Sequence, residues 1–128
     1  MKLLLDTHAF LWAVMQPAKL SAKARRLLES ADTELIVSAA SAWEIATKYR
    51  LGRLPDAKPI LTDFNDVMRR LDARILAISH THALRSGSYP QDHADPFDRM
   101  LAAQAELEHL PLVSCDTALR QFHIELVW

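Results

Sequence analysis

Short apolar segments alternate with amphipathic segments along the chain, and this alternation constrains the fold more than any other feature. The apolar segments, which favour β-strands, are residues 2–5, 35–37, 74–78, 112–114 and 124–127. The segments between them, residues 7–14, 22–30, 38–49, 59–71, 81–85, 95–110 and 116–121, favour helices. Strands joined by helices pair in parallel through right-handed crossovers. The sequence therefore predicts an α/β fold, a three-layer α/β/α sandwich with a mostly parallel central sheet.

The size of the chain suits one domain. Half of the 128 residues are hydrophobic, which is enough for a proper core, so we expect a single domain across residues 1–128. The longest apolar runs are far too short to span a bilayer, and Asp6 interrupts the N-terminal run that a signal peptide would need. Cys115 is the only cysteine, so no intrachain disulfide can form. We expect a cytoplasmic protein without membrane contact.

Several function classes are disfavoured. The formal net charge of −1 is not that of a polycation, so nucleic-acid binding would need a local basic surface or a metal bridging to phosphate. Gly52 and Gly87 are the only glycines, which argues against a phosphate-cradling loop. The six histidines match no zinc spacing, although His93 precedes Asp95 by two residues. Cys115 has no triad pattern around it, and we expect it to be a small buried residue.

Four acidic residues stand where apolar segments end or helical segments begin. They are Asp6, Glu44, Asp98 and Asp116. In open α/β sheets the ligand crevice lies beyond the carboxyl ends of the strands, so these four can converge on one crevice. Carboxylates that gather repel one another and lose hydration, and a hard cation such as Mg²⁺ or Mn²⁺ is a common reason to gather them. The pattern therefore favours a metal site.

Each of these acids also has a structural explanation. Asp6 and Asp116 each precede a helical segment and can act as N-caps. Asp95, directly before Pro96, is a near-ideal N-cap. Asp98 then falls in the first helical turn, where a negative charge complements the helix dipole. Taken singly, a cap is at least as good an interpretation as a metal ligand for Asp6, and a better one for Asp116.

Glu44 and the basic residues that follow it leave two interpretations open. Glu44 can be solvated and paired with Lys48 one turn later, or it can face inward at the edge of the sheet. Lys48, Arg50 and Arg53 lie on the same segment and are the best candidates to hold a phosphate backbone. Arg99, beside Asp98, is a weaker candidate, and most basic clusters read as solvated helix faces.

Four stretches together resemble PIN-domain ribonucleases, and specifically the VapC-type toxins of type II toxin–antitoxin pairs. They occur in the family's order and the resemblance covers the whole chain. The stretches are Leu4-Leu5-Asp6-Thr7-His8; Val37-Ser38-Ala39-Ala40-Ser41-Ala42-Trp43-Glu44-Ile45; Asp95-Pro96-Phe97-Asp98-Arg99-Met100-Leu101-Ala102-Ala103-Gln104-Ala105; and Leu112-Val113-Ser114-Cys115-Asp116.

The resemblance implies a compact α/β/α fold and endonuclease activity on RNA that depends on Mg²⁺ or Mn²⁺. It implies that the four acids are catalytic and metal-binding, with Asp6 and Asp98 holding the principal ion and Glu44 and Asp116 completing the pocket. Asp95 is then an accessory ligand or cap, and the hydroxyls of Thr7 and Ser114 are supporting groups that orient the carboxylates or a water. The resemblance also implies a VapB-type antitoxin whose tail occupies the toxin's groove, a toxin homodimer and a toxin–antitoxin hetero-oligomer.

Two other functions compete with this interpretation. The chain can be a non-catalytic module that binds RNA or a protein through the same groove, although a pure RNA binder gains nothing from concentrated negative charge. It can also be a phosphate-receiving signalling domain, which likewise places acids at strand ends. Such domains usually carry paired acids near the first strand, whereas Asp6 stands alone after its strand.

Overall fold

The computed structural model describes residues 1–128, and its centre is a five-stranded sheet in the order β3-β2-β1-β4-β5. Every pair of neighbouring strands is parallel. In the register, Leu4 of β1 lies opposite Ile36 of β2 on one side and Leu112 of β4 on the other. The strands are β1 (Lys2–Leu5), β2 (Glu34–Ser38), β3 (Ala73–Leu76), β4 (Leu112–Val113) and β5 (Leu126–Val127).

Helices and short 3₁₀ turns join the strands. They are α1 (Thr7–Met15), η1 (Pro17–Lys19), α2 (Ala22–Glu29), α3 (Ala39–Arg50), η2 (Pro55–Ala57), α4 (Lys58–Thr62), α5 (Phe64–Leu71), α6 (His80–Ser88), α7 (Pro96–Leu107) and η3 (Thr117–Gln121). Side-chain N-caps start most of the longer helices because they satisfy backbone N–H groups that have no partner within the helix. The capping residues are Asp6, Ser21, Ser38, Asp63, Ser79 and Asp95.

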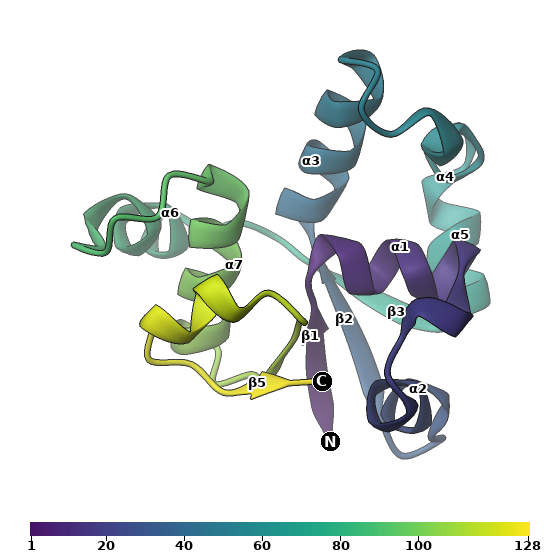
Figure 1. The fold of residues 1–128 in the computed structure, drawn as a ribbon, viewed down its shortest axis with the longest axis horizontal. Helices are drawn as coiled ribbons and strands as arrows, with labels where there is room; N and C mark the ends of the chain where they lie inside the picture. Colours follow the sequence, from purple (N-terminus) through teal and green to yellow (C-terminus); the bar gives the residue numbers. More distant parts are fainter.

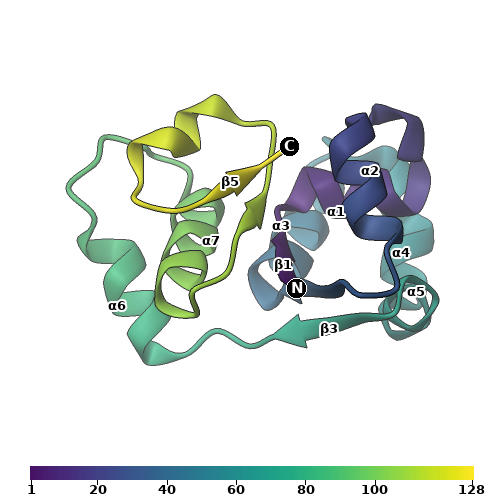
Figure 2. The same cartoon turned by 90° about the horizontal axis from the view of Figure 1, so that it is seen from below.

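Two hydrophobic cores lie on opposite faces of the sheet, because successive residues of a strand point to opposite faces. The first core contains strand residues Leu3, Leu5, Leu35, Val37 and Val113, packed against α1, α2 and α5. The second contains Leu4, Ile36 and Leu112, packed against α7 and η3. Figure 1 shows α6 and α7 on one side of the sheet and α1, α2 and α5 on the other, and Figure 2 shows the same division from below. The predicted three-layer α/β/α sandwich is thus confirmed.

Most element boundaries differ from the predicted ones by one to three residues, and four elements illustrate the differences. The single helix expected over residues 59–71 is two helices, α4 and α5, because Asp63 leaves the helical conformation (φ −147°, ψ 78°) and its side chain caps α5. The strand expected at residues 74–78 is β3 (Ala73–Leu76), and α6 is longer than the expected 81–85. The last strand is confined to Leu126–Val127, where it pairs with β4.

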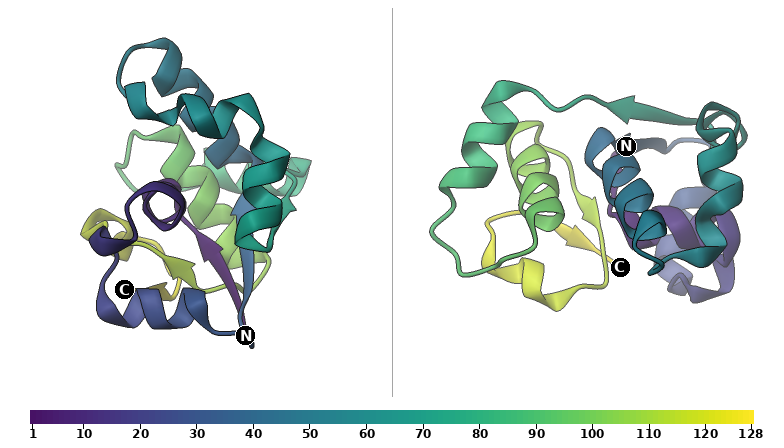
Figure 3. Two further views of the ribbon diagram at one scale, coloured as in Figure 1. Left: turned by 90° about the vertical axis from the view of Figure 1, so that its right-hand side faces the viewer. Right: turned by 90° about the horizontal axis from the view of Figure 1, so that it is seen from above.

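The carboxyl ends of β1, β2 and β4 lie at one edge of the sheet and lead directly into α1, α3 and the turn before η3. Helices α3 and α7 contact each other beside this edge, as the view from above in Figure 3 shows. No helix combines the length and the apolar character needed to cross a membrane.

Candidate active site at the carboxyl edge of the sheet

Asp6 follows the last residue of β1 and is buried, with 6% of its surface exposed. Its Oδ1 accepts a hydrogen bond of 2.7 Å from the backbone N–H of Ala9, so the residue caps α1. Burial nevertheless raises the pKa of the Asp6 carboxyl, and the nearby charge of Glu44 adds to the rise, while the Ser114 hydroxyl and the Ala9 N–H lower it. Asp6 is therefore both a cap and a poorly solvated anion that would gain from a cation.

Glu44 lies in the second turn of α3 and faces the interior, with only 3% of its surface exposed. Its Oε2 forms an ion pair with the Nζ of Lys48, four residues later. Glu44 thus faces inward, as the second sequence interpretation expected. It also pairs with Lys48, as the first expected, but it is not solvated. The charge of Glu44 also raises the pKa values of Asp6 and Asp98, so the three carboxylates share one electrostatic environment.

Asp98 lies in the first turn of α7, and its Oδ2 accepts a hydrogen bond of 3.0 Å from the Nε2 of His93. Its Oδ1 accepts no hydrogen bond from the protein. Burial raises the pKa of Asp98 to about 6, against the effect of His93 and helped by the charges of Asp95 and Glu44. Asp95 caps α7 through hydrogen bonds from the N–H groups of Phe97 and Asp98, at 2.9 and 3.3 Å.

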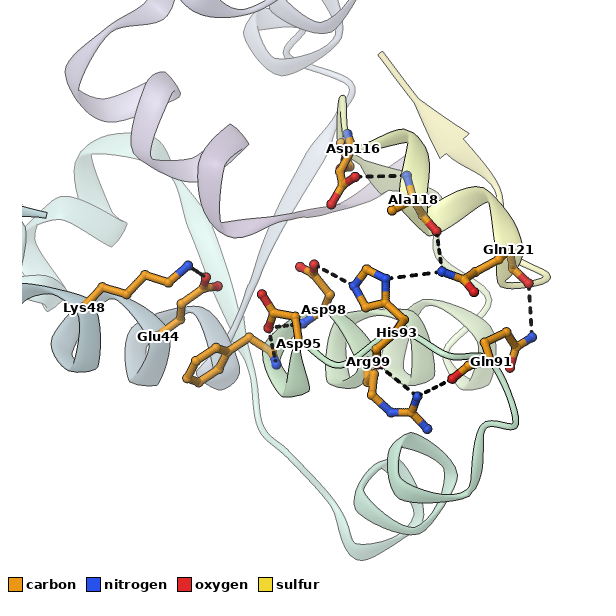
Figure 4. A network of polar contacts seen from close by, with 12 residues as sticks. Glu44, Lys48, Gln91, His93, Asp95, Asp98, Arg99, Asp116, Ala118 and Gln121 are labelled. Atoms are coloured by element: carbon orange, nitrogen blue, oxygen red, sulfur yellow. Dashed lines mark hydrogen bonds and ion pairs between the residues drawn. The ribbon is translucent and has the colours of Figure 1, made fainter. Parts of the chain in front are cut away.

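Asp116 differs from the other three acids in being exposed. Its Oδ1 accepts a hydrogen bond of 2.9 Å from the N–H of Ala118 and caps η3. The backbone N–H of Asp116 donates to the Oγ of Ser114 at 3.1 Å. The Ser114 hydroxyl also lowers the pKa of the Asp6 carboxyl. Asp116 is therefore held at the solvent side of the same edge (Figure 4).

The supporting hydroxyls have separate partners. Ser114 is buried between Asp6 and Asp116, as described above. The Oγ1 of Thr7 donates to the Oγ of Ser41 at 3.0 Å, and both residues are buried. This bond ties the start of α1, where Asp6 lies, to α3, which carries Glu44. Thr7 therefore fixes the helices rather than contacting an acid.

The predicted phosphate-binding residues do not form one group. Lys48 is paired with Glu44, whereas Arg50 and Arg53 are exposed at the end of α3 and in the turn after it. Arg99 donates to four backbone carbonyls, those of Ser86, Tyr89, Gln91 and His93, at 2.6–3.1 Å. Four of its five N–H groups are thus used within the fold. Arg99 holds the loop before α7, which leaves little of its guanidinium for a phosphate.

The donor set suits a hard divalent cation. Asp6, Glu44 and Asp98 offer carboxylate oxygens at one edge, and Lys48 is the only Lys or Arg side chain paired with any of them. No three His, Cys, Asp or Glu side chains lie close enough together to surround a metal ion by themselves. A Mg²⁺ ion held here would be bound by one or two of these carboxylates and would keep several water ligands, as Mg²⁺ usually does.

Three contributors were not predicted from the sequence. Ser41 supports Thr7, while His93 and Gln121 form a hydrogen-bonded chain that reaches Asp98. Their only sequence signal was the proximity of His93 to Asp95 along the chain.

The expectation that Cys115 is buried is wrong, because the residue follows β4 on the exposed side of the edge.

Comparison with known proteins gives the class to which this site belongs. A PIN-domain family model matches residues 3–124. Ribonuclease VapC22 of Mycobacterium tuberculosis (strain ATCC 25618 / H37Rv) is 32% identical over 118 residues, which are 91% of this chain and 88% of that protein. The chain therefore belongs to the PIN-domain family.

Within the family the likeness is to proteins of the VapC type. Ribonuclease VapC16 of the same organism is 41% identical over 58 residues, 45% of this chain and 41% of that protein, so that match spans less than half of either. Two solved structures share the fold. VapBC2 from Rickettsia felis, bound to a promoter DNA fragment, has a TM-score of 0.73 at 15% identity and covers 99% of this chain and 98% of that one. A toxin–antitoxin complex from Klebsiella pneumoniae has a TM-score of 0.62 at 19% identity and covers 98% of this chain and 96% of that one.

Proposed function

We propose that the chain is the toxin of a type II toxin–antitoxin pair and acts as a metal-dependent endoribonuclease. The observation that carries this proposal is the group of Asp6, Glu44 and Asp98 at the carboxyl edge of a PIN domain, where burial and mutual repulsion raise the pKa values of Asp6 and Asp98. Both VapC relatives are named ribonucleases, which supports RNA as the substrate.

Asp6 and Asp98 would hold a Mg²⁺ or Mn²⁺ ion, directly or through water, and Glu44 and Asp116 would complete the acidic pocket. The chemistry that a bound divalent cation supplies is polarisation of the scissile phosphate and acidification of a nearby water. The Ala9 N–H fixes the Asp6 carboxylate, and Lys48 fixes that of Glu44. These contacts hold the negative charges in place before substrate arrives, which avoids reorganisation during the reaction.

We propose that the RNA strand runs past Asp116. A surface hollow beside this residue is lined by Lys23, Thr117 and Arg120. We propose that Lys23 and Arg120, with Arg50 at the end of α3 and Arg53 in the turn after it, contact the phosphates of the strand, since positive charge is what sequence-independent RNA binding needs. Water attack in line with the leaving group predicts fragments with a 5′-phosphate and a 3′-hydroxyl.

The test is cleavage of total cellular RNA by the purified chain in Mg²⁺, in Mn²⁺ and in chelator. Asp6→Asn is the informative variant. Asp63→Asn is the matched control, because Asp63 also caps a helix, α5, but is not one of the acids at the carboxyl edge. We expect metal-dependent fragments with 5′-phosphates from the unmodified chain and from Asp63→Asn, and none from Asp6→Asn. Cleavage that persists in chelator, or in Asp6→Asn, would reject the proposal.

A non-catalytic binding module is the alternative, and the same experiment separates the two. Binding of RNA without cleavage in either metal would favour the module. The buried acids argue against it, since concentrated negative charge weakens contact with a phosphate backbone.

We further propose a VapB-type antitoxin as partner, supported by two structural neighbours that are toxin–antitoxin complexes. A hollow between α1, α4 and α5, lined by Val14, Ile60 and Val67 among others, offers an apolar surface for it.

Expression of the chain alone should then arrest bacterial growth, Asp6→Asn should relieve the arrest, and co-expression of the antitoxin should restore growth. Growth arrest by Asp6→Asn would contradict a nuclease toxin. The homodimer and the cytoplasmic location stay predictions, to be tested by sedimentation and by fractionation.

A further inference from the structure

A chain of hydrogen bonds connects the exposed end of the acidic edge to Asp98 (Figure 4). Asp116 caps η3 through the N–H of Ala118. The carbonyl of Ala118 accepts from the Nε2 of Gln121 at 3.0 Å, and the same nitrogen lies 3.2 Å from the Nδ1 of His93. The Nε2 of His93 lies 3.0 Å from the Oδ2 of Asp98. Two of the four acids are thus linked through a glutamine and a histidine.

The directions of these bonds set the tautomer of His93. A backbone carbonyl can only accept, so the Gln121 atom facing Ala118 must be the amide nitrogen, which has two hydrogens. Its second hydrogen points to Nδ1 of His93, which must then be the acceptor. The ring proton therefore lies on Nε2 and is donated to Asp98.

His93 is also held by its backbone and its ring face. Arg99 donates to the carbonyls of Gln91 and His93 at 2.9 and 3.1 Å. The ring packs edge-on against Phe122, with 5.7 Å between centroids, and its side chain is 12% exposed. His93 is therefore held at its backbone, at its ring face and at both ring nitrogens. A simple surface ion pair with Asp98 would not need so many contacts to orient the ring.

We propose that His93 is a positioning residue that aims Asp98, with Gln121 keeping its proton on Nε2. The bond to Oδ2 stops the carboxylate from rotating and leaves Oδ1, which has no protein partner, available to a divalent cation. This inference rests on the proposed function. Loss of such a supporting contact typically costs about 10- to 100-fold in metal affinity or activity.

The tautomer can be read without any variant. Long-range ¹H–¹⁵N spectra of the metal-free chain distinguish a ring protonated at Nε2 from one protonated at Nδ1. We expect the Nε2–H form for His93, and a larger share of the Nδ1–H form in Gln121→Leu, where only Asp98 still favours a proton on Nε2. An Nδ1–H ring in the unmodified chain would overturn the inference.

The affinity for Mn²⁺ alone, measured by electron paramagnetic resonance without RNA, tests the consequence. His93→Leu should bind Mn²⁺ about 10- to 100-fold more weakly. His93→Gln should keep most of the affinity, because a glutamine amide can place a donor where Nε2 was. His80→Leu, at an exposed histidine outside the chain of bonds, is the matched control and should bind normally. Melting curves establish that each variant is folded.

The outcomes separate this inference from the function on which it rests. If the unmodified chain neither binds Mn²⁺ nor cleaves RNA, the proposed function fails. If it does both and His93→Leu binds Mn²⁺ as tightly, the function stands and the role of His93 is rejected. Equal losses in His93→Leu and His93→Gln in folded protein would also reject it.

Discussion

Asp98→Asn should stabilise the metal-free protein at neutral pH, although it removes a residue of the proposed active site. In the folded chain the pKa of Asp98 rises from the ordinary 3.8 to about 6, mainly through burial. Between these values the native state binds more protons than the unfolded chain, so the free energy of unfolding falls as pH rises through this window. Above about pH 6 Asp98 is ionised in the native state, so the whole unfavourable free energy of its buried charge lowers the free energy of unfolding.

The size of the effect follows from the shift. The gap between 3.8 and about 6 corresponds to about 3 kcal/mol, at about 1.4 kcal/mol per pKa unit. Asparagine keeps an oxygen that accepts from His93, but it loses the favourable charge at the start of α7, worth about 0.3–1 kcal/mol. The carboxylate is also 21% exposed, so we expect a net gain of about 1–2 kcal/mol at pH 7.5.

Urea unfolding at several pH values is the assay. The gain should be small near pH 4, grow up to about pH 6 and then level off, with Asp92→Asn, at an exposed aspartate in the same loop, as the control. Added Mg²⁺ should stabilise the unmodified chain and not Asp98→Asn, since a ligand stabilises only the state that binds it. A gain that does not change with pH, or a loss of stability at pH 7.5, would refute the reasoning.

Three further substitutions test other parts of the site. Asp6→Asn should abolish RNA cleavage but melt no lower than the unmodified chain at neutral pH, because asparagine caps about as well as aspartate and burial already raises the pKa of the Asp6 carboxyl. A large drop in Tm would show that the charge itself supports the fold. Lys48→Ala leaves Glu44 buried without its partner and should lower the free energy of unfolding in urea by about 2 kcal/mol. Lys48→Arg should largely restore this stability. An unchanged free energy of unfolding in Lys48→Ala would contradict the pairing. Arg99→Lys should lower the free energy of unfolding by about 2 kcal/mol or more, because an ammonium group cannot reproduce the guanidinium contacts to four carbonyls. Arg53→Lys, at an exposed site, is the control and should change the free energy of unfolding little. Equal effects of the two substitutions would reject the role of Arg99 in holding the loop.

The layered fold could be predicted because the physical signals were local. Leu3, Leu4 and Leu5 form an unbroken apolar run, as expected of a parallel strand that is buried on both faces. Capping residues marked the helix starts at Ser21 and Asp95. The break at Asp63 was missed because the apolar spacing runs through it without interruption. There a side-chain cap competes with a continued helix, and tertiary packing decides between them.

The candidate site was predictable in part for a similar reason. The rule that ligand sites form beyond the carboxyl ends of parallel strands located Asp6 and Asp116. The burial of Glu44 could not be predicted, because an i,i+4 pair with Lys48 is equally possible on a solvated and on an inward face. The roles of Arg99 and His93 depend on the path of residues 89–93, which lie between the predicted helical segments 81–85 and 95–110 and were assigned no structure.

The most direct test of the central claim is a crystal structure of the chain soaked in Mn²⁺, with an anomalous difference map at the manganese absorption edge. We predict a peak at the carboxyl edge of the sheet between Asp6 and Asp98, lost in crystals of Asp6→Asn. Peaks only at exposed carboxylates elsewhere, with none at this edge, would contradict a metal site built from these acids.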